Sequence, residues 1–303
     1  MALEKEIWQT DIVGNLYKGN DFLTRSTNVD QYVLAGKVVH IPNAGAGSGV
    51  VRNRSSLPAT VTKRTDTDIV YALDEYTSNP ITIPNIDTIQ LSYDKRASVI
   101  GEDMASIREL VADWMLRNWA PTAAAQFLRT TGAAVLSASP GATGNRKGLT
   151  KEDLKKARLA MNKQNIPQEG RVALIPSDMM DFLLSDADLL KRDKSLELDV
   201  KGGVIAKLYG FELMERSATL VYTNAATPVV KDPGQATAAT DNQAAILWHP
   251  SIVERALGTV DMFERLGDPT YYGDIYSFLV MAGGRIRRGD GKGIFAIIED
   301  AAA

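Results

Sequence analysis

The sequence predicts an α+β protein, and three features of its 303 residues carry this prediction. Short segments rich in Val, Ile, Thr and Tyr, typical of strands, fill much of the region before residue 94. One long amphipathic helix follows over residues 94–120. Helices and strands then alternate, and the last third of the chain is rich in strands again.

The first 35 residues indicate an extended polar arm, with a weak helical pattern over Glu4–Leu16. Large apolar residues, among them Trp8 and Phe22, stand isolated between polar ones. Such residues need a surface to pack on, which is either a neighbouring subunit or the arm's own domain. The sequence leaves these two alternatives equally open.

Residues 36–93 indicate an elongated β hairpin that contains a flexible stretch with Gly45, Gly47 and Gly49. A two-stranded hairpin is marginally stable alone in water, so we expect it to lie on another surface. The predicted strands are Lys37–Ile41, Thr60–Thr62, Ile69–Leu73, Ile81–Ile83 and Thr88–Tyr93.

The helix over residues 94–120 is predicted by an apolar stripe and ends before Pro121. The stripe consists of Ile100, Met104, Ile107, Val111 and Trp114. Residues 133–149 are then expected to form a loop. Thr150 and Asp153 resemble a capping box, which starts a helix whose buried face is Leu154, Ala157 and Met161.

The remaining elements follow from the same patterns of apolar, Gly and Pro residues. We expect strands at Arg171–Ile175, Val204–Tyr209, Phe211–Glu215, Ala244–Trp248, Val260–Glu264 and Ile275–Arg287, a short helix from Ser177 to Leu184, and one or two helical turns at Pro250–Leu257. We expect the turn at residues 288–293 to lead into Ile294–Glu299, which closes a hairpin.

Composition excludes several function classes. The chain has no Cys, so disulfides, thiolate metal sites and a cysteine nucleophile are excluded. Its only two histidines, His40 and His249, argue against a multi-histidine metal site. The formal charge of −3 argues against a dedicated nucleic-acid-binding protein. No apolar run is long enough for a spanning helix and no secretory signal is visible, so we expect no membrane partner.

The motifs of catalysis and cofactor binding are not matched, so the sequence predicts no enzyme, cofactor or metal site. The glycines around Ser48 fit neither the dinucleotide fingerprint nor a nucleophile elbow. The segment Gly291-Lys292-Gly293 departs from the P-loop pattern. The pairs Asp66/Asp68 and Asp186/Asp188 lack the further ligands of a calcium loop. An enzyme of unrecognised type is the less favoured alternative.

Several stretches, taken in order and spacing, resemble the major capsid proteins of tailed bacteriophages with the Hong Kong 97-type fold. These stretches cover nearly the whole chain: Gly36-Lys-Val-Val-His-Ile-Pro42, Leu91-Ser-Tyr-Asp-Lys-Arg96 with the helix after it, Leu149–Leu154, Asn165–Ser177, Leu208-Tyr-Gly-Phe-Glu-Leu213, Ala244–Pro250 and Tyr272–Arg287. Each stretch is degenerate alone.

The resemblance implies a division of the chain into an N-arm with connector (1–42), an extended loop (43–90), a peripheral domain with the spine helix (91–148), an axial domain (149–255) and peripheral return strands (256–303). It implies a structural subunit that assembles with itself, as hexamers and pentamers, into an icosahedral shell. The shell would enclose double-stranded DNA in the virion, after assembly in the host cytoplasm. An encapsulin-type nanocompartment shell is the alternative.

The resemblance also implies partners. A separate scaffolding protein is expected, because Met1 almost directly precedes the arm, together with a portal and a possible decoration protein. Some members of the family link a loop Lys to an Asn of the peripheral domain. Lys63 could be that Lys, but residues 251–303 contain no Asn, so we predict no such cross-links.

Contacts between subunits must then come from packing and ion pairs. The candidates on the loop are Arg52, Arg54, Lys63 and Arg64. A second basic group, Arg285, Arg287 and Arg288, could meet acidic residues of a neighbour or phosphate, or be an ordinary charged face. With Trp8 and Phe22 of the arm, these residues complete the expected intersubunit contacts.

Overall fold

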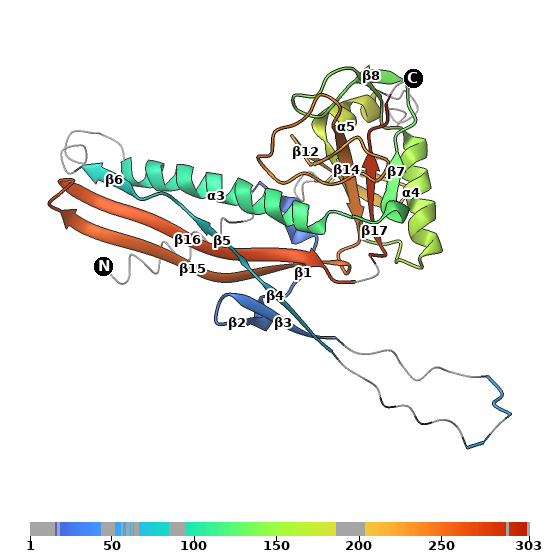
Figure 1. Ribbon diagram of the computed structural model, residues 1–303, viewed down its shortest axis with the longest axis horizontal. Coiled ribbons are helices and arrows are strands. Elements are labelled where there is room, and N and C mark those ends of the chain that lie inside the picture. The colour runs from blue at the N-terminus through green and yellow to red at the C-terminus, as the bar shows by residue number, and fades with distance from the viewer. Residues whose placement is uncertain are drawn as a thin grey trace.

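The computed structural model describes residues 16, 19–43, 52–55, 57, 58, 61, 63, 67–84, 95–185, 204–288 and 291–301. A long hairpin and a long helix lie side by side at one end of the molecule, and an α/β body lies at the other end (Figure 1). A small separate sheet lies beside the hairpin and leads into the extended loop (Figure 1). The α+β class is confirmed.

The first region is a five-stranded sheet built on the long hairpin. Its strands are β1 (Thr27–Asn28), β15 (Val253–Asp268), β16 (Gly273–Ile286), β5 (Asp74–Thr77) and β6 (Ile81–Pro84). Their order is β1-β15-β16-β5, and β6 also pairs with β16. β15 and β16 are antiparallel with Glu254 opposite Arg285. The helical turns expected at Pro250–Leu257 are therefore wrong, because pairing with β16 holds this segment extended from Val253 onward.

Helix α3 (Lys95–Trp119) lies along this hairpin and confirms the predicted long helix. Its buried stripe differs from the predicted one, however. Ile107 and Val111 are buried as expected, but the stripe continues through Met115 to Trp119 rather than through Trp114, which is half-buried. The C-terminal half of the helix also contacts the body, because Trp119 packs against Trp248 and Arg216 reaches Asp113.

The body contains a seven-stranded sheet. Its strands are β7 (Phe127–Arg129), β10 (Arg171–Pro176), β11 (Val204–Leu208), β12 (Phe211–Arg216), β13 (Leu220–Tyr222), β14 (Asn242–Trp248) and β17 (Ile294–Ile298). The order is β11-β12-β10-β14-β17-β7, with β13 on β14. Every residue of β10, β14 and β17 is buried, which makes these strands the centre of the core.

The last strand does not close a hairpin with β16, as the sequence analysis expected. β17 pairs with β14 and, in parallel, with β7. β7 and β17 thus belong to the body's sheet. This pairing joins residues 127–129 to residues 296–298. Short-range sequence patterns cannot predict the pairing of segments that lie so far apart in the chain.

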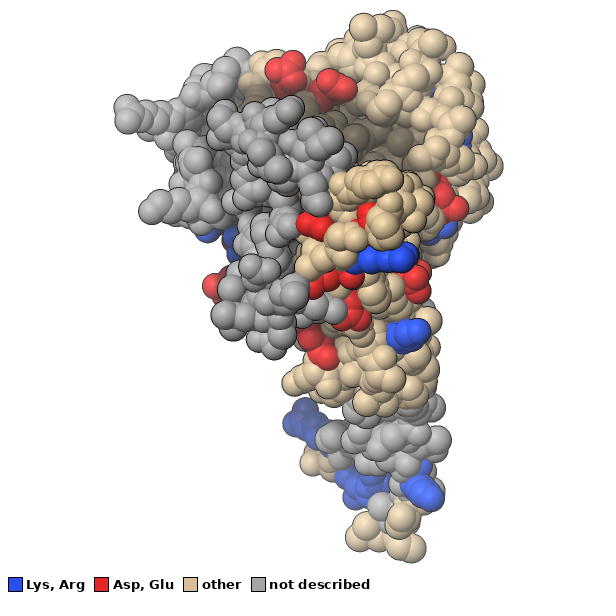
Figure 2. All heavy atoms as spheres, turned by 90° about the vertical axis from the view of Figure 1, so that its left-hand side faces the viewer, with Lys and Arg blue, Asp and Glu red and all other residues tan. Residues whose placement is uncertain are grey.

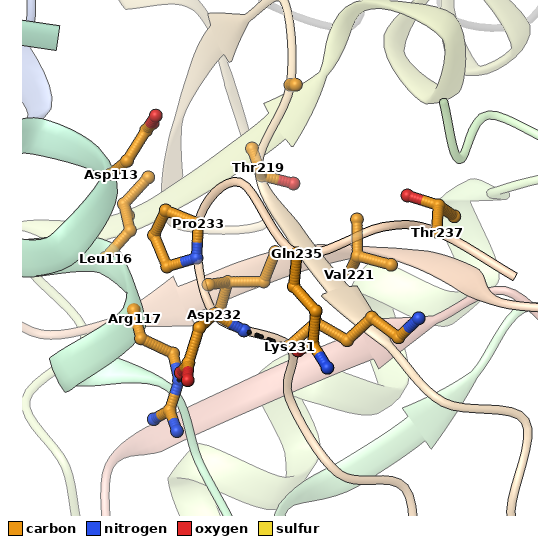
Figure 3. Close-up of a pocket in the computed structure, with 12 residues that line it drawn as sticks. Asp113, Leu116, Arg117, Thr219, Val221, Lys231, Asp232, Pro233, Gln235 and Thr237 are labelled. Atoms are coloured by element: carbon orange, nitrogen blue, oxygen red, sulfur yellow. Dashed lines mark hydrogen bonds and ion pairs between the residues drawn. The ribbon is translucent and has the colours of Figure 1, made fainter. Parts of the chain in front are cut away.

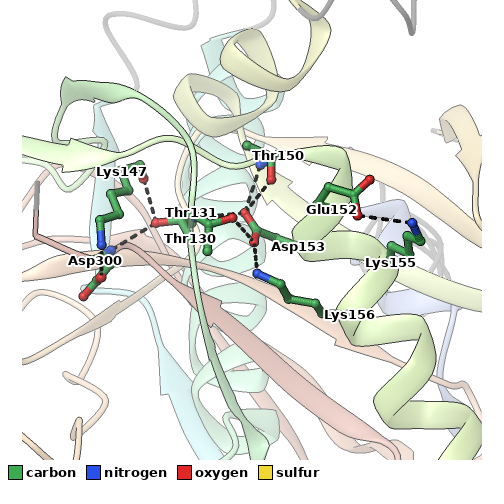
Figure 4. A network of polar contacts seen from close by, with 9 residues as sticks. All are labelled: Thr130, Thr131, Lys147, Thr150, Glu152, Asp153, Lys155, Lys156 and Asp300. Atoms are coloured by element: carbon green, nitrogen blue, oxygen red, sulfur yellow. Dashed lines mark hydrogen bonds and ion pairs between the residues drawn. The ribbon is translucent and has the colours of Figure 1, made fainter.

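Two of the described helices pack on the body, and both match the prediction. α4 (Lys151–Lys163) begins at the capping box of Thr150 and Asp153, and its inner face of Leu154, Ala157 and Met161 is fully buried. Asp153 accepts hydrogen bonds from the backbone N–H of Thr150 (3.1 Å) and the hydroxyl of Thr131 (2.7 Å), as Figure 4 shows. α5 (Ser177–Leu184) follows β10.

The remaining elements are short. Residues 133–149, expected to be a loop, contain the hairpin of β8 (Ala134–Leu136) and β9 (Asn145–Lys147). The 3-10 helices are η1 (Asp21–Thr24), η2 (Asp30–Tyr32) and η3 (Ala124–Gln126). A three-stranded sheet of β2 (Val33–Leu34), β3 (Val38–Asn43) and β4 (Thr67–Ala72) forms the base of the extended loop. The strand expected at Thr88–Tyr93 lies outside the described residues.

Candidate assembly surfaces

The base of the extended loop is fixed to its own protomer by a small second core. Val29, Val39, Ile41 and Leu73 pack there with Ala256 and Met281 of the long hairpin. The N–H of Thr259 donates to the carbonyl of Gly36 (3.2 Å), and a side chain at Gly258 would collide with that carbonyl. Contacts within its own protomer therefore fix the direction in which the loop leaves the hairpin.

A buried carboxylate strengthens this anchorage. Glu254, fully buried on β15, forms an ion pair with Arg285 on β16 at 2.9 Å. The Arg285 guanidinium lies 5.0 Å from the ring centroid of Tyr71 on β4. Burial, followed by the charge of Glu254, raises the pKa of the Tyr71 hydroxyl, so that group stays neutral. Arg285 thus has partners within its own chain, and its role as an intersubunit contact stays a prediction.

The neighbouring basic residues lie closer to the surface. Arg287 also reaches Glu254, at 3.3 Å, and keeps 39% of its side chain exposed. Arg288 is exposed after the end of β16. These two residues stay candidates for contact with another subunit.

The tip of the loop carries exposed basic and apolar side chains together. Arg52, Arg54 and Lys63 are exposed. Leu57 and Val61 between them are 83% and 96% exposed, the highest values among the exposed large hydrophobic residues. Arg64 lies outside the described residues, as does Trp8 of the arm. The tip therefore presents cations and unburied apolar surface on the same short segment.

A groove of about 410 Å³ lies between β5 and α3. Leu110, which is 45% exposed, and the half-buried Trp114 line it from the helix. Tyr76 and Thr77 line it from the strand, together with the exposed carboxylates of Asp74 and Glu75. The groove thus combines an apolar wall with an acidic rim.

The acidic character continues along α3. Glu102 and Glu109 are exposed on this helix, and Asp103 is half-buried. Burial, followed by the charge of Glu102, raises the pKa of Asp103. In Figure 2 acidic side chains gather above the loop, and basic side chains gather at the lower end, where the loop lies. The groove, with Asp74 and Glu75, and the loop tip, with its exposed basic residues, therefore have opposite charge.

The arm residues that the structure describes pack on their own chain. Phe22 is 2% exposed, with its ring edge-on to Trp119 and 5.7 Å below the guanidinium carbon of Arg216. The indole N–H of Trp248 donates to the carbonyl of Arg25 (2.8 Å). Phe22 is therefore a core residue, and its assignment as an intersubunit contact is wrong. Of the two surfaces that the sequence left open for the arm, this part packs on its own protomer.

Ion pairs fix α3 to the body. The Arg216 guanidinium at the end of β12 contacts Asp113 at 2.6 Å and Glu109 at 3.0 Å, one helical turn apart. Closer to the end of α3, Arg117 pairs with Asp232 at 2.7 Å. The body residues Arg216 and Asp232 thus hold the C-terminal half of α3.

A small cavity of about 130 Å³ lies at this junction (Figure 3). Its two cations are both paired, Arg117 with Asp232 and Lys231 with Asp241 at 2.5 Å. The cavity is therefore part of a structural junction. Among the described residues no group of His, Asp and Glu is placed to hold a metal ion, and no described helix is long and apolar enough to cross a membrane.

Comparison with known proteins identifies the family. The model of a family described as phage capsid protein matches residues 13–266, well over half of the chain. No curated protein matches. Solved structures with this fold include the capsid of cyanophage P-SCSP1u, with a TM-score of 0.62 and 16% identity over 91% of this chain and 86% of that one.

Two further structures extend the likeness. The capsid of Ralstonia phage GP4 has a TM-score of 0.60 and 13% identity, covering 92% of this chain and 87% of that one. A virus-like particle from Pyrococcus furiosus has a TM-score of 0.52 and 11% identity, covering 97% and 99%. At these identities the structures show the Hong Kong 97-type fold alone. The family match establishes that this chain belongs to the phage capsid protein family, as a structural protein that builds the capsid shell, a major capsid protein.

Proposed function

We propose that the extended loop of one subunit docks on the groove between β5 and α3 of a neighbouring subunit, and that this contact joins subunits into hexamers and pentamers. The complementarity of the two surfaces carries the proposal. Arg52, Arg54 and Lys63 supply the positive charge, and Asp74 and Glu75 supply the negative charge. Leu57 and Val61 would gain a partner in Leu110 and Trp114.

Both parts of the contact are needed energetically. An exposed ion pair contributes about 0–1 kcal/mol. Burial of apolar surface contributes about 25 cal/mol per Å², so a largely exposed Leu or Val that becomes covered adds about 1.5–3 kcal/mol. The charges then set the register and speed of docking, while the apolar side chains supply most of the affinity.

A charge exchange tests the docking. Arg52→Glu with Arg54→Glu should stop assembly, and so should Asp74→Lys with Glu75→Lys. Mixing the two variants should restore assembly at the contacts where reversed loop meets reversed groove. Arg265→Glu is the control, since Arg265 is exposed at the far end of the hairpin. Normal assembly of either reversed variant would contradict the proposal.

We further propose that the shell encloses double-stranded DNA in the virion, with assembly in the host cytoplasm, a separate scaffolding protein, a portal and a possible decoration protein. Membership of the phage capsid family supports this proposal. The test is the content of purified particles. Nuclease-protected double-stranded DNA is expected, and particles that hold a protein cargo instead would favour the encapsulin-type alternative.

A further inference from the structure

The outward face of α4 is strongly basic in a chain whose formal charge is −3. Lys155, Lys156, Arg158 and Lys163 are exposed on this helix. Glu152 is its only exposed carboxylate, because the other acidic residue of α4, Asp153, is buried in the capping box. The exposed side chains of α4 therefore carry a clear excess of positive charge.

The face is held rigidly. The inner residues of α4 are fully buried, and the network around Asp153 fixes its first turn, with Lys156 at 3.2 Å from the Asp153 carboxylate (Figure 4). Lys155 contacts Glu152 at 3.3 Å on the surface, and the Arg158 guanidinium carbon lies 5.7 Å from the Tyr209 ring centroid. A partner would thus meet a preformed array of charges rather than a flexible tail.

The acidic groove described above does not lie near this face. The groove between β5 and α3 belongs to the hairpin region, whereas α4 lies on the far side of the body (Figure 1). That groove is also the proposed partner of the loop. The basic face of α4 therefore fits an anionic partner other than this groove.

We propose that the basic face of α4, made of Lys155, Lys156, Arg158 and Lys163, contacts the phosphate backbone of the enclosed double-stranded DNA. The proposal rests on the proposed enclosure of DNA, and it places α4 on the inner side of the shell. From Lys155 to Lys163 the helix rises about 12 Å, which is close to the axial span of three to four phosphates of one strand. Contacts to phosphate carry no sequence information, so the binding is expected to be non-specific.

Binding of a fluorescent DNA duplex to unassembled subunits is the first test. Lys155→Glu with Lys163→Glu should lower the duplex affinity more than tenfold at about 0.1 M salt. In a plot of the logarithm of the association constant against the logarithm of the salt concentration, the slope should become less steep by about 2. Lys37→Glu with Arg265→Glu changes the net charge equally, at exposed positions on the loop base and the hairpin. Equal affinity of the two double variants would overturn the proposal.

The second test separates DNA from a protein partner and reports the side of the shell. In DNA-filled shells Lys155 and Lys163 should react more slowly with an acetylating reagent than in empty shells, while Lys37 should be unchanged. Leu159, 54% exposed on the same helix, should tolerate Leu159→Ser without loss of duplex affinity, since phosphate contacts do not need it. Equal lysine reactivity in filled and empty shells would overturn the proposal. Shells that still form and hold DNA would leave the proposed function intact.

Discussion

The ring of Phe22 meets the indole of Trp119 edge-on, with 6.3 Å between the ring centroids. This contact joins the arm to the last turn of α3. The ring centroids of Trp119 and Trp248 are in turn 5.8 Å apart. The indole N–H of Trp119 donates to the carbonyl of Glu254 at 3.0 Å. The arm, α3, the long hairpin and the body thus share one aromatic centre, so the arm from about residue 20 is part of the folded protomer.

Phe22→Ala should therefore destabilise the isolated subunit. The side chain is buried, and truncation of a buried Phe costs about 3–5 kcal/mol through lost burial and the cavity left behind. Denaturant unfolding of the unassembled subunit measures the effect. Phe263→Ala is the matched control, because Phe263 is 53% exposed and its truncation should change stability by less than about 0.5 kcal/mol. Equal effects of the two substitutions would place Phe22 outside the core.

Gly258→Ala should disturb the base of the loop. The added methyl group would collide with the carbonyl oxygen of Gly36 and lie 2.7 Å from a Leu73 methyl, so about 1–3 kcal/mol of destabilisation is expected from overpacking. Gly101→Ala, inside α3 with nothing within 4 Å of the new Cβ, should instead stabilise by about 0.5–1 kcal/mol. Thermal unfolding distinguishes the two. A stabilising Gly258→Ala would show that the loop base is not tightly packed there.

Glu299 gives the protein a pH-dependent stability. It is buried, and burial raises its pKa above the ordinary 4.5, although the N–H groups of Ala138 (2.8 Å) and Gln243 (2.9 Å) act in the opposite direction. The folded state therefore binds a proton more readily than the unfolded state. This contribution is fully present below pH 4.5 and is lost as the pH rises through the raised value.

Glu299→Gln removes this titration. The stability difference between the natural protein and the variant should thus favour the natural protein more at acid pH than at pH 7. Unfolding free energies measured at several pH values test it. A difference that grows in favour of Glu299 as the pH rises would show that its hydrogen bonds outweigh burial.

Assembled particles should contain no covalent links between subunits. Lys63 is exposed on the loop, but residues 251–303 hold no Asn to receive it. A denaturing gel of boiled mature particles should therefore show this chain as a single band at its mass of about 32.9 kDa. A ladder of multimers that resists boiling in denaturant and reductant would contradict this prediction.

The elements with strong local signals were predictable from the sequence. The capping box at Thr150, the buried face of α4 and the strand before Pro176 all follow from short-range patterns, and all are confirmed. The segment after Pro250 shows the limit of such patterns. Ile252, Val253 and Ala256 repeat at helical spacing, but the pairing of Glu254 with Arg285 makes the segment a strand. Only tertiary structure supplies that partner.

Of the two parts of the candidate site, the basic loop could be predicted from the sequence and the acidic groove could not. The basic residues of the loop are adjacent in sequence, so Arg52 and Arg54 could be singled out. The acidic groove could not, because Asp74 and Trp114 become neighbours only when α3 packs beside β5. Phe22 was misassigned because an isolated aromatic residue in a polar arm gives no sign of which surface covers it.

Assembly of the purified chain tests the central claim most directly. Negative-stain electron microscopy, with light scattering on the same sample, should be recorded with and without co-expressed phage proteins. The account predicts closed shells, tubes or capsomer rings, and their loss in the Arg52→Glu, Arg54→Glu variant. A homogeneous monomer or dimer of the natural chain under every condition would contradict it.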